Sequence, residues 1–305
     1  MDRKKSGADC VNWDKAAAHP RVLAALATQS EMWPEVRTEL GELQPRWITA
    51  EALFANAAAI DEYLDYEGSF RTGTDRKTCA AAMMVDYCYI FSIATVPLFV
   101  GFGMVPDLSP SLFALQFYTG SMKHDGQTFE VRRAHVRYLP AAFSFGREGY
   151  VHGLGADMLP DGGLCDLYRR AVEMHFEPLV KQLRAATGLS RNALWRLLAD
   201  GIAGCFLDAG TRFDRLAQAK ASAMTVLKQP GSPLNNRQLH YFDLTVADDN
   251  QREISHTFRA RGGCCRYYTV EGGELCSTCV LKPPTERDEE LRAAMRRHFG
   301  LGDAV

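Results

Sequence analysis

Four cysteines near the end of the chain are the residues whose type and spacing most directly indicate chemistry. They are Cys264, Cys265, Cys276 and Cys279, in the pattern Cys-Cys-x10-Cys-x2-Cys. Thiolates are soft ligands that select zinc, copper(I) or iron-sulfur clusters, and four of them complete a tetrahedral zinc site or the ligand set of a 2Fe-2S cluster. The sequence therefore predicts that these four cysteines bind a metal cofactor.

The spacing of the cysteines bears on which metal they bind. A zinc knuckle usually pairs two Cys-x2-Cys units, or one such unit with a histidine pair. Here only Cys276 and Cys279 form such a unit. Neighbouring side chains such as Cys264 and Cys265 diverge in extended backbone, which makes joint ligation of one ion awkward, whereas two sulfide-bridged irons can take them separately. The spacing favours a 2Fe-2S cluster, and structural zinc is the alternative.

Charged residues surround the cysteine run. Arg259, Arg261 and Arg266 are cations that would favour the reduced, more negative form of a cluster and raise its potential, or attract a donor or an anionic chelate. Glu271 and Glu274 oppose them. Solvated loop charges without either role are the alternative interpretation.

The rest of the chain shows no second cofactor motif. None of the histidines has the spacing of a ligand pair, and His256, just before the cysteine run, is the best candidate for a supporting contact. Tyr267 and Tyr268 could either shield the cluster from water or anchor the loop, and we expect them to anchor it. The glycine-rich stretches lack the frame of a nucleotide-binding turn. We therefore expect the electrons to come from another protein or a small reductant.

Composition indicates an ordinary globular protein. The chain has 305 residues, 47% of them hydrophobic and 24% charged, with a formal charge of -2, which predicts no nucleic-acid partner. The cysteine count of 9 is odd and the N-terminus has no apolar signal core, so we expect a cytoplasmic location. Five cysteines lie outside the run and are expected to be small buried side chains: Cys10, Cys79, Cys88, Cys165 and Cys205.

The hydrophobic pattern predicts an α+β fold that is mainly α-helical, with a small antiparallel β-sheet. Two β-rich segments joined through Asp125-Gly126 predict a hairpin. A further strand is expected just before the cysteines. The predicted helices cover residues 22–43 with a break at Pro34, then 49–66, 75–94, 164–186, 190–209, and a closing helix from about Thr285; the predicted strands cover 112–119, 128–138 and 241–246.

We divide the chain into a helical body, residues 1–250, and a C-terminal cluster-binding segment with its closing helix, residues 251–305. Residues 87–105 carry no charge and approach the length of a membrane span. Pro97 and two glycines interrupt them, so we expect a buried core helix that does not cross a membrane. Peripheral membrane association stays open.

The cysteine run resembles the C-terminal cluster motif of the FhuF-like siderophore-iron reductases. The resemblance rests on Arg261-Gly-Gly-Cys264-Cys265-Arg-Tyr-Tyr268, followed by Gly272-Gly-Glu-Leu-Cys276-Ser-Thr-Cys279-Val-Leu281. Leu194-Trp195 and Pro233-Leu-Asn extend it weakly upstream. The family typically ends in Cys-Gly-x-Cys-Pro, whereas this chain has Ser277 and Val280 at those positions, and the potential of the cluster is expected to differ accordingly.

The resemblance implies a cytoplasmic enzyme that gives one electron to the ferric iron of an imported siderophore, often of the hydroxamate type, through a 2Fe-2S cluster. Reduction to Fe2+ weakens the hold of hard anionic oxygen ligands and releases the metal. The electron donor would be a ferredoxin-like protein or a small reductant. A zinc-containing binding protein and a 2Fe-2S electron carrier for a partner protein are the alternatives.

Overall fold

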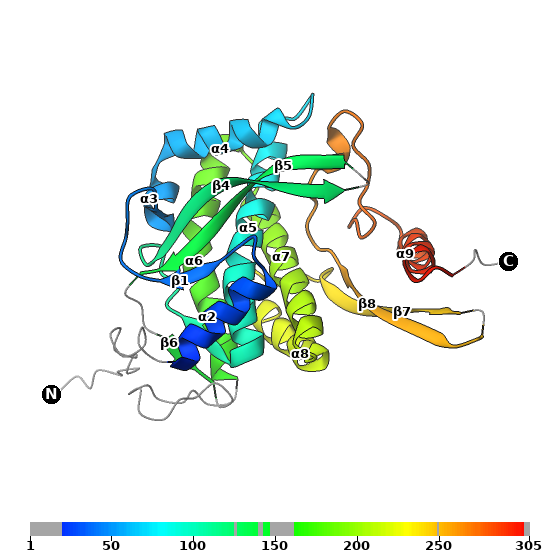
Figure 1. The fold of residues 1–305 in the computed structure, drawn as a ribbon. Helices are drawn as coiled ribbons and strands as arrows, with labels where there is room; N and C mark the ends of the chain where they lie inside the picture. Colours follow the sequence, from blue (N-terminus) through cyan, green and yellow to red (C-terminus); the bar gives the residue numbers. More distant parts are fainter. Residues whose placement is uncertain (1–19, 125–126, 140–142, 147–161, 249, 302–305) are drawn as a thin grey trace.

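A long apolar helix forms the centre of the fold. The computed structural model of the protein describes residues 20–124, 127–139, 143–146, 162–248 and 250–301. Helix α5, Arg76–Phe102, is buried along most of its length and packs against α2, Pro20–Met32, α4, Ala57–Ser69, α6, Gly163–Thr187, and α7, Arg191–Arg212 (Figure 1). By length and composition α5 is the one helix among the described residues that could cross a membrane, and it is mostly buried inside the protein.

Helix α5 continues through Pro97 to Phe102, whereas the sequence predicted its end near Ala94. Proline has no N–H, so the carbonyl of Ile93 loses its helical partner. The buried Gln29 of α2 supplies a replacement, since its Nε2 donates to Ile93 O at 3.1 Å. The helix ends instead at Gly103, which adopts the left-handed conformation (φ 61°) that suits glycine.

The segment after Pro34 is a strand, although the sequence predicted helix to residue 43. Strand β1, Thr38–Leu40, follows α2 because side chains at the end of that helix hold the backbone extended. Ser30 Oγ accepts from Thr38 N at 2.9 Å, and Gln29 Nε2 donates to Val36 O at 2.8 Å. These bonds compete with the helical ladder, so the helix prediction there was wrong.

The predicted helix over residues 49–66 is present as two helices, α3, Ala50–Ala55, and α4. Asn56 separates them in an extended conformation, and its side chain accepts from Ala59 N at 3.2 Å. Asparagine is a preferred helix cap because it satisfies such free N–H groups.

The predicted hairpin is confirmed. Strands β4, Phe113–His124, and β5, Gln127–Tyr138, pair antiparallel along their whole length, while Asp125 and Gly126 lie outside the described residues. Strand β1 joins β5 in parallel and β2, Ile48–Thr49, joins β4. The sheet order is β1-β5-β4-β2. A second, two-stranded sheet pairs β3, Met104–Pro106, with β6, Phe143–Phe145.

The helix pair predicted over residues 164–186 and 190–209 is also confirmed. Helices α6 and α7 are separated at Gly188, a left-handed residue (φ 71°), and Ser190 caps α7 by accepting from Ala193 N at 3.2 Å. Helix α8, Leu216–Leu227, follows and was not predicted.

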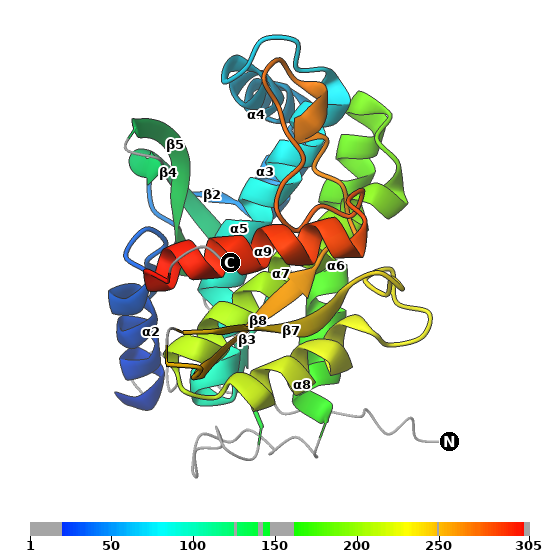
Figure 2. The same cartoon turned by 90° about the vertical axis from the view of Figure 1, so that its right-hand side faces the viewer.

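The C-terminal part projects from the helical body as a hairpin with one helix beside it (Figures 1 and 2). Strand β7, His240–Ala247, confirms the predicted strand, and its partner β8, Glu253–Ala260, was not predicted. Helix α9, Pro284–Phe299, is the expected closing helix, and it packs on the hairpin through a small core of its own. That core consists of Leu244, Val246, Leu291 and Met295.

A buried histidine links α6 to the central helix. His175 has no exposed surface; Tyr87 Oη lies 2.7 Å from its Nε2, and Leu108 O lies 2.7 Å from its Nδ1. Burial lowers the pKa of this imidazole to about 4. The histidine is therefore a neutral member of the aromatic core.

The fold class is as predicted, mainly helical α+β with small sheets. The division at residues 250 and 251 falls inside the β7–β8 hairpin, and the two-part organisation stays a prediction.

Candidate metal centre

The cysteine run lies in the irregular segment between β8 and α9, where η1, Tyr267–Thr269, is a single 3-10 turn. This segment, coloured orange in Figure 1, lies beside the loop that follows α4. Glu271 N donates to Thr72 O at 3.3 Å, and the Arg71 guanidinium stacks over the Tyr267 ring at 4.5 Å. The loop that carries the cysteines is thus attached to the helical body.

Two glycines seat the start of the run on α7. Gly262 N and Gly263 N each donate to the Asp200 carboxylate at 2.8 Å. A side chain at either glycine would collide with its surroundings: a Cβ on Gly262 would lie 2.0 Å from Asn236 Oδ1, and one on Gly263 would lie 2.8 Å from Leu197 N. Glycine at position 263 lets the backbone approach α7 this closely, and glycine at position 262 leaves room for the Asn236 side chain.

The four cysteines gather in this loop with different degrees of exposure. Cys264, Cys265 and Cys276 are partly buried and Cys279 is buried. Cys276 and Cys279 sit in one turn, in which Cys279 N donates to Cys276 O at 2.9 Å. The predicted Cys-x2-Cys unit therefore has the compact backbone turn that such units have in metal sites.

The thiols are organised around one close pair. A hydrogen bond from Cys276 lowers the pKa of Cys265 and the same bond raises that of Cys276, while burial raises the pKa of Cys264. Cys264 Sγ accepts instead from Arg266 N at 3.4 Å. The adjacent Cys264 and Cys265 thus have different partners, as expected for diverging side chains. Among the described residues, no three His, Cys, Asp or Glu side chains converge as a set for one ion.

Arg261 places a cation against the central thiol pair. Its Nη1 lies 3.3 Å from Cys276 Sγ and 4.0 Å from Cys265 Sγ, and its side chain is only 14% exposed. Burial works against its charge, but Asp200 and the two cysteines outweigh that effect and raise the pKa of Arg261. A permanent positive charge thus faces the sulfurs, and it stabilises their deprotonated form, which is the form that binds metals.

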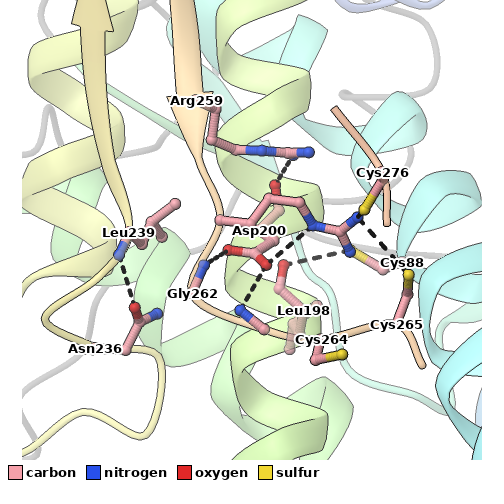
Figure 3. Close-up of polar contacts among 12 residues, drawn as sticks. Cys88, Leu198, Asp200, Asn236, Leu239, Arg259, Gly262, Cys264, Cys265 and Cys276 are labelled. Atoms are coloured by element: carbon pink, nitrogen blue, oxygen red, sulfur yellow. Dashed lines mark hydrogen bonds and ion pairs between the residues drawn. The ribbon is translucent and has the colours of Figure 1, made fainter. Parts of the chain in front are cut away.

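Asp200 is the anchor of this arrangement (Figure 3). It is 2% exposed, and its Oδ2 lies 3.5 Å from Arg261 Nε. The Arg259 side chain donates a hydrogen bond to the backbone carbonyl oxygen of the same residue, Asp200 O. Burial raises the pKa of the Asp200 carboxyl, and the two arginines and the two glycine amides oppose that shift. One buried carboxylate therefore orients both the backbone that leads into the run and the guanidinium that touches its sulfurs.

Of the charged residues and the histidine predicted to lie near the cysteines, only some place their side chains in contact with the thiols. Arg261 contacts the thiols directly, whereas the Arg259 side chain bonds to α7 and the Arg266 side chain pairs with Asp75 at 2.7 Å. His256 lies on β8 with its ring against Phe258 at 4.7 Å.

The flanking tyrosines and the remaining cysteines also have defined places. Tyr267 anchors the loop under Arg71, as expected, while Tyr268 is 44% exposed. Of the cysteines outside the run, three are buried and one is half-buried, and Cys10 lies outside the described residues. The four described ones are Cys79, Cys88, Cys165 and Cys205.

Sequence reasoning missed Asp200. It lies on the buried stripe of α7, near Leu197 and Ile202, and every other buried position of that helix is apolar. A carboxylate on such a stripe needs a buried partner, because an unpaired buried charge is costly. A carboxylate on an otherwise apolar stripe could therefore have marked Asp200 from the sequence, although it would not have shown that the partners are Arg261, Gly262 and Gly263.

The residues present fit a sulfur-ligated cluster. Four thiols form a soft donor set, and the Arg261 guanidinium offers hydrogen-bond donors and positive charge to an anionic group bound there. The approach of backbone N–H groups, such as Arg266 N on Cys264, adds to that compensation.

Comparison with known proteins identifies this segment. Residues 261–281 match the family model of the FhuF 2Fe-2S C-terminal domain. No curated protein matches the chain. The match covers Arg261, the two glycines and all four cysteines of the run. The chain therefore carries an FhuF-like C-terminal domain, whose cofactor is a 2Fe-2S cluster.

Proposed function

We propose that this protein is a ferric-siderophore reductase, in which Cys264, Cys265, Cys276 and Cys279 hold the 2Fe-2S cluster. The bound cluster would supply one-electron transfer. One electron from an external donor converts Fe3+ in the siderophore to Fe2+, and the oxygen ligands then release the metal and take up protons from water. The single observation that carries the proposal is the match of residues 261–281 to the FhuF 2Fe-2S domain.

The surroundings of the cysteines support such a role. Arg261 offsets the negative charge that four thiolates gather in a half-buried loop, and Asp200 holds that arginine in place. The reaction needs no proton from a protein side chain and no covalent bond between the protein and the siderophore. We further propose a hydroxamate siderophore as substrate, a ferredoxin-like protein or small reductant as donor, and the cytoplasm as the location.

Metal analysis and mixing experiments test the proposal. Protein purified without oxygen should contain iron and acid-labile sulfide, absorb visible light and give an EPR signal after dithionite reduction. A colourless protein with stoichiometric zinc would contradict it. Reduced protein should then be reoxidised by ferric hydroxamates. If no ferric siderophore oxidises it while a partner protein does, the chain is an electron carrier.

A further inference from the structure

A pocket opens beside Cys264, which we call the Cys264 pocket. Its volume is about 410 Å³, and Gly262, Gly263 and Cys264 line one side of it. Leu189 and Ser190, just before α7, and Asn192, Ala193 and Arg196 in its first turns also line it. An occupant of this pocket would touch a residue that the proposed function assigns to the cluster.

The Cys264 pocket carries positive charge, and none of the described residues that line it is acidic. Arg196 and Arg266 both contribute to it. Arg266 is paired with Asp75. Arg196, in contrast, has no ion pair with any residue that the structure describes; its Nη1 donates to the neutral Gln238 at 3.2 Å. Its Nε is buried and has no hydrogen-bond partner in the described part of the chain. The charge of Arg196 is therefore still open to an anionic ligand.

The same pocket has apolar side chains in its lining. Tyr268 is 44% exposed and Leu281 is 52% exposed, and Val280 lies beside them. These side chains are exposed to solvent next to a cation without an ion-pair partner. Such a lining favours a ligand that has both an apolar part and an anionic group.

Resting on the proposed function, we propose that the Cys264 pocket binds the ferric chelate itself and selects chelates of net negative charge through Arg196. The thiolates and the cluster repel an anionic substrate, but Arg261 already compensates the charge of the sulfurs and Arg196 lies in the pocket lining itself, so the attraction of Arg196 outweighs that repulsion where the chelate meets Cys264. Contact with this residue also keeps the path of the electron short. The substrate class is therefore an anionic ferric chelate, such as a hydroxamate siderophore with a free carboxylate.

Gallium chelates test the proposal apart from any redox reaction, because Ga3+ takes the place of Fe3+ and is not reduced. Two probes share one coordination sphere: the gallium complex of a linear trihydroxamate with a free terminal amine, and the same complex with that amine succinylated to a carboxylate. Calorimetry with the cluster-loaded protein should show that the anionic complex binds roughly ten-fold more tightly than the cationic one.

Substitutions at Arg196 test whether this side chain causes the preference for the anionic complex. Arg196→Gln should weaken binding of the anionic complex roughly ten-fold and should not weaken binding of the cationic complex, while Arg196→Lys keeps most of the affinity for the anionic one. Arg191→Gln is the matched control, since this arginine also lies in the first turns of α7 but is already paired with Glu177 at 2.7 Å. Circular dichroism of each variant verifies that it is folded.

The outcomes separate this proposal from the proposed function. Equal binding of both complexes, or an unchanged affinity in folded Arg196→Gln, overturns the pocket assignment even if the protein reduces ferric siderophores. Slower electron transfer from a ferredoxin to that variant, with gallium binding intact, also overturns it and assigns Arg196 to the donor. Charge-selective gallium binding in a protein that reduces no chelate supports the pocket and contradicts the reductase function.

Discussion

Replacing Arg261 by glutamine should lower the reduction potential of the cluster while the cluster still assembles. The substitution removes a positive charge whose Nη1 lies 3.3 Å from Cys276 Sγ, together with the donors that face the sulfurs. It also leaves the buried Asp200 with one cation fewer. All three effects disfavour the more negative, reduced form, so they act in the same direction.

The size of the shift follows from the contact distance. Two unit charges 3.3 Å apart interact by about 1.3 kcal/mol in a water-like medium and about 5 kcal/mol at an effective dielectric constant of about 20. The added electron is shared among the thiolates and the metal, so we take about 1–2 kcal/mol, which corresponds to a decrease of about 40–90 mV for a one-electron couple. Arg261→Lys keeps the charge and should shift the potential by less.

A redox titration followed by EPR or visible absorption measures this shift. Arg212→Gln is the matched control: Arg212 lies near the end of α7, is 43% exposed and pairs with Asp208, so its removal should leave the potential unchanged. An unchanged or higher potential in Arg261→Gln, with iron and sulfide contents equal to those of the wild type, would refute the reasoning.

Three further predictions concern the loop and the core. Gly263→Ala should destabilise the protein by about 1–3 kcal/mol and reduce cluster occupancy, because the new Cβ would lie 2.8 Å from Leu197 N. Gly41→Ala is the control: its Cβ would make only ordinary contacts, from 3.5 Å, so thermal unfolding should be nearly unchanged. Cys276→Ser should lose or alter the cluster by iron analysis with the helical circular dichroism retained, and global unfolding would contradict this. His175 has a pKa of about 4 in the folded protein and about 6.5 in the unfolded chain; the unfolded state binds more protons between these values, so stability should fall as pH drops from about 6.5 to 4. Folded His175→Gln should lack this part of the pH dependence, and an identical dependence in urea titrations would contradict the assignment.

Elements governed by neighbouring residues could be predicted from the sequence. The α6–α7 pair is separated at Gly188, and α9 ends at Gly300, both of which are left-handed residues that the pattern marks. The β4–β5 hairpin followed from its β-rich segments. In each case the signal and the structure lie within a few residues of each other.

Elements that depend on distant partners could not be predicted. Helix α5 passes through Pro97 because Gln29, far away in the sequence, takes over a free carbonyl. Strand β1 forms because Val136 N donates to Arg37 O at 2.8 Å, which holds the segment against β5. Strand β8 requires its partner β7, and its own residues do not alternate strictly in burial. Such interactions override local propensity.

The candidate site divides in the same way. The cysteines lie close together in the sequence, so their spacing indicated a thiolate site, and Arg261 was one of three arginines considered as a cation beside it. Asp200 and Arg196 reach the site only through the docking of the loop on α7. Their roles depend on a tertiary contact made possible by Gly262 and Gly263, and no local pattern encodes it.

The most direct test of the account is the yield of ferrous iron in a single turnover. Protein loaded with its cluster, reduced stoichiometrically and freed of reductant, is mixed without oxygen with a ferric hydroxamate siderophore and a chromogenic Fe2+ chelator. We predict loss of the EPR signal of the reduced cluster, with about one Fe2+ formed per cluster oxidised, as a one-electron couple requires. A cluster that stays reduced in the presence of every ferric siderophore tried, with no Fe2+ formed, would contradict the central claim.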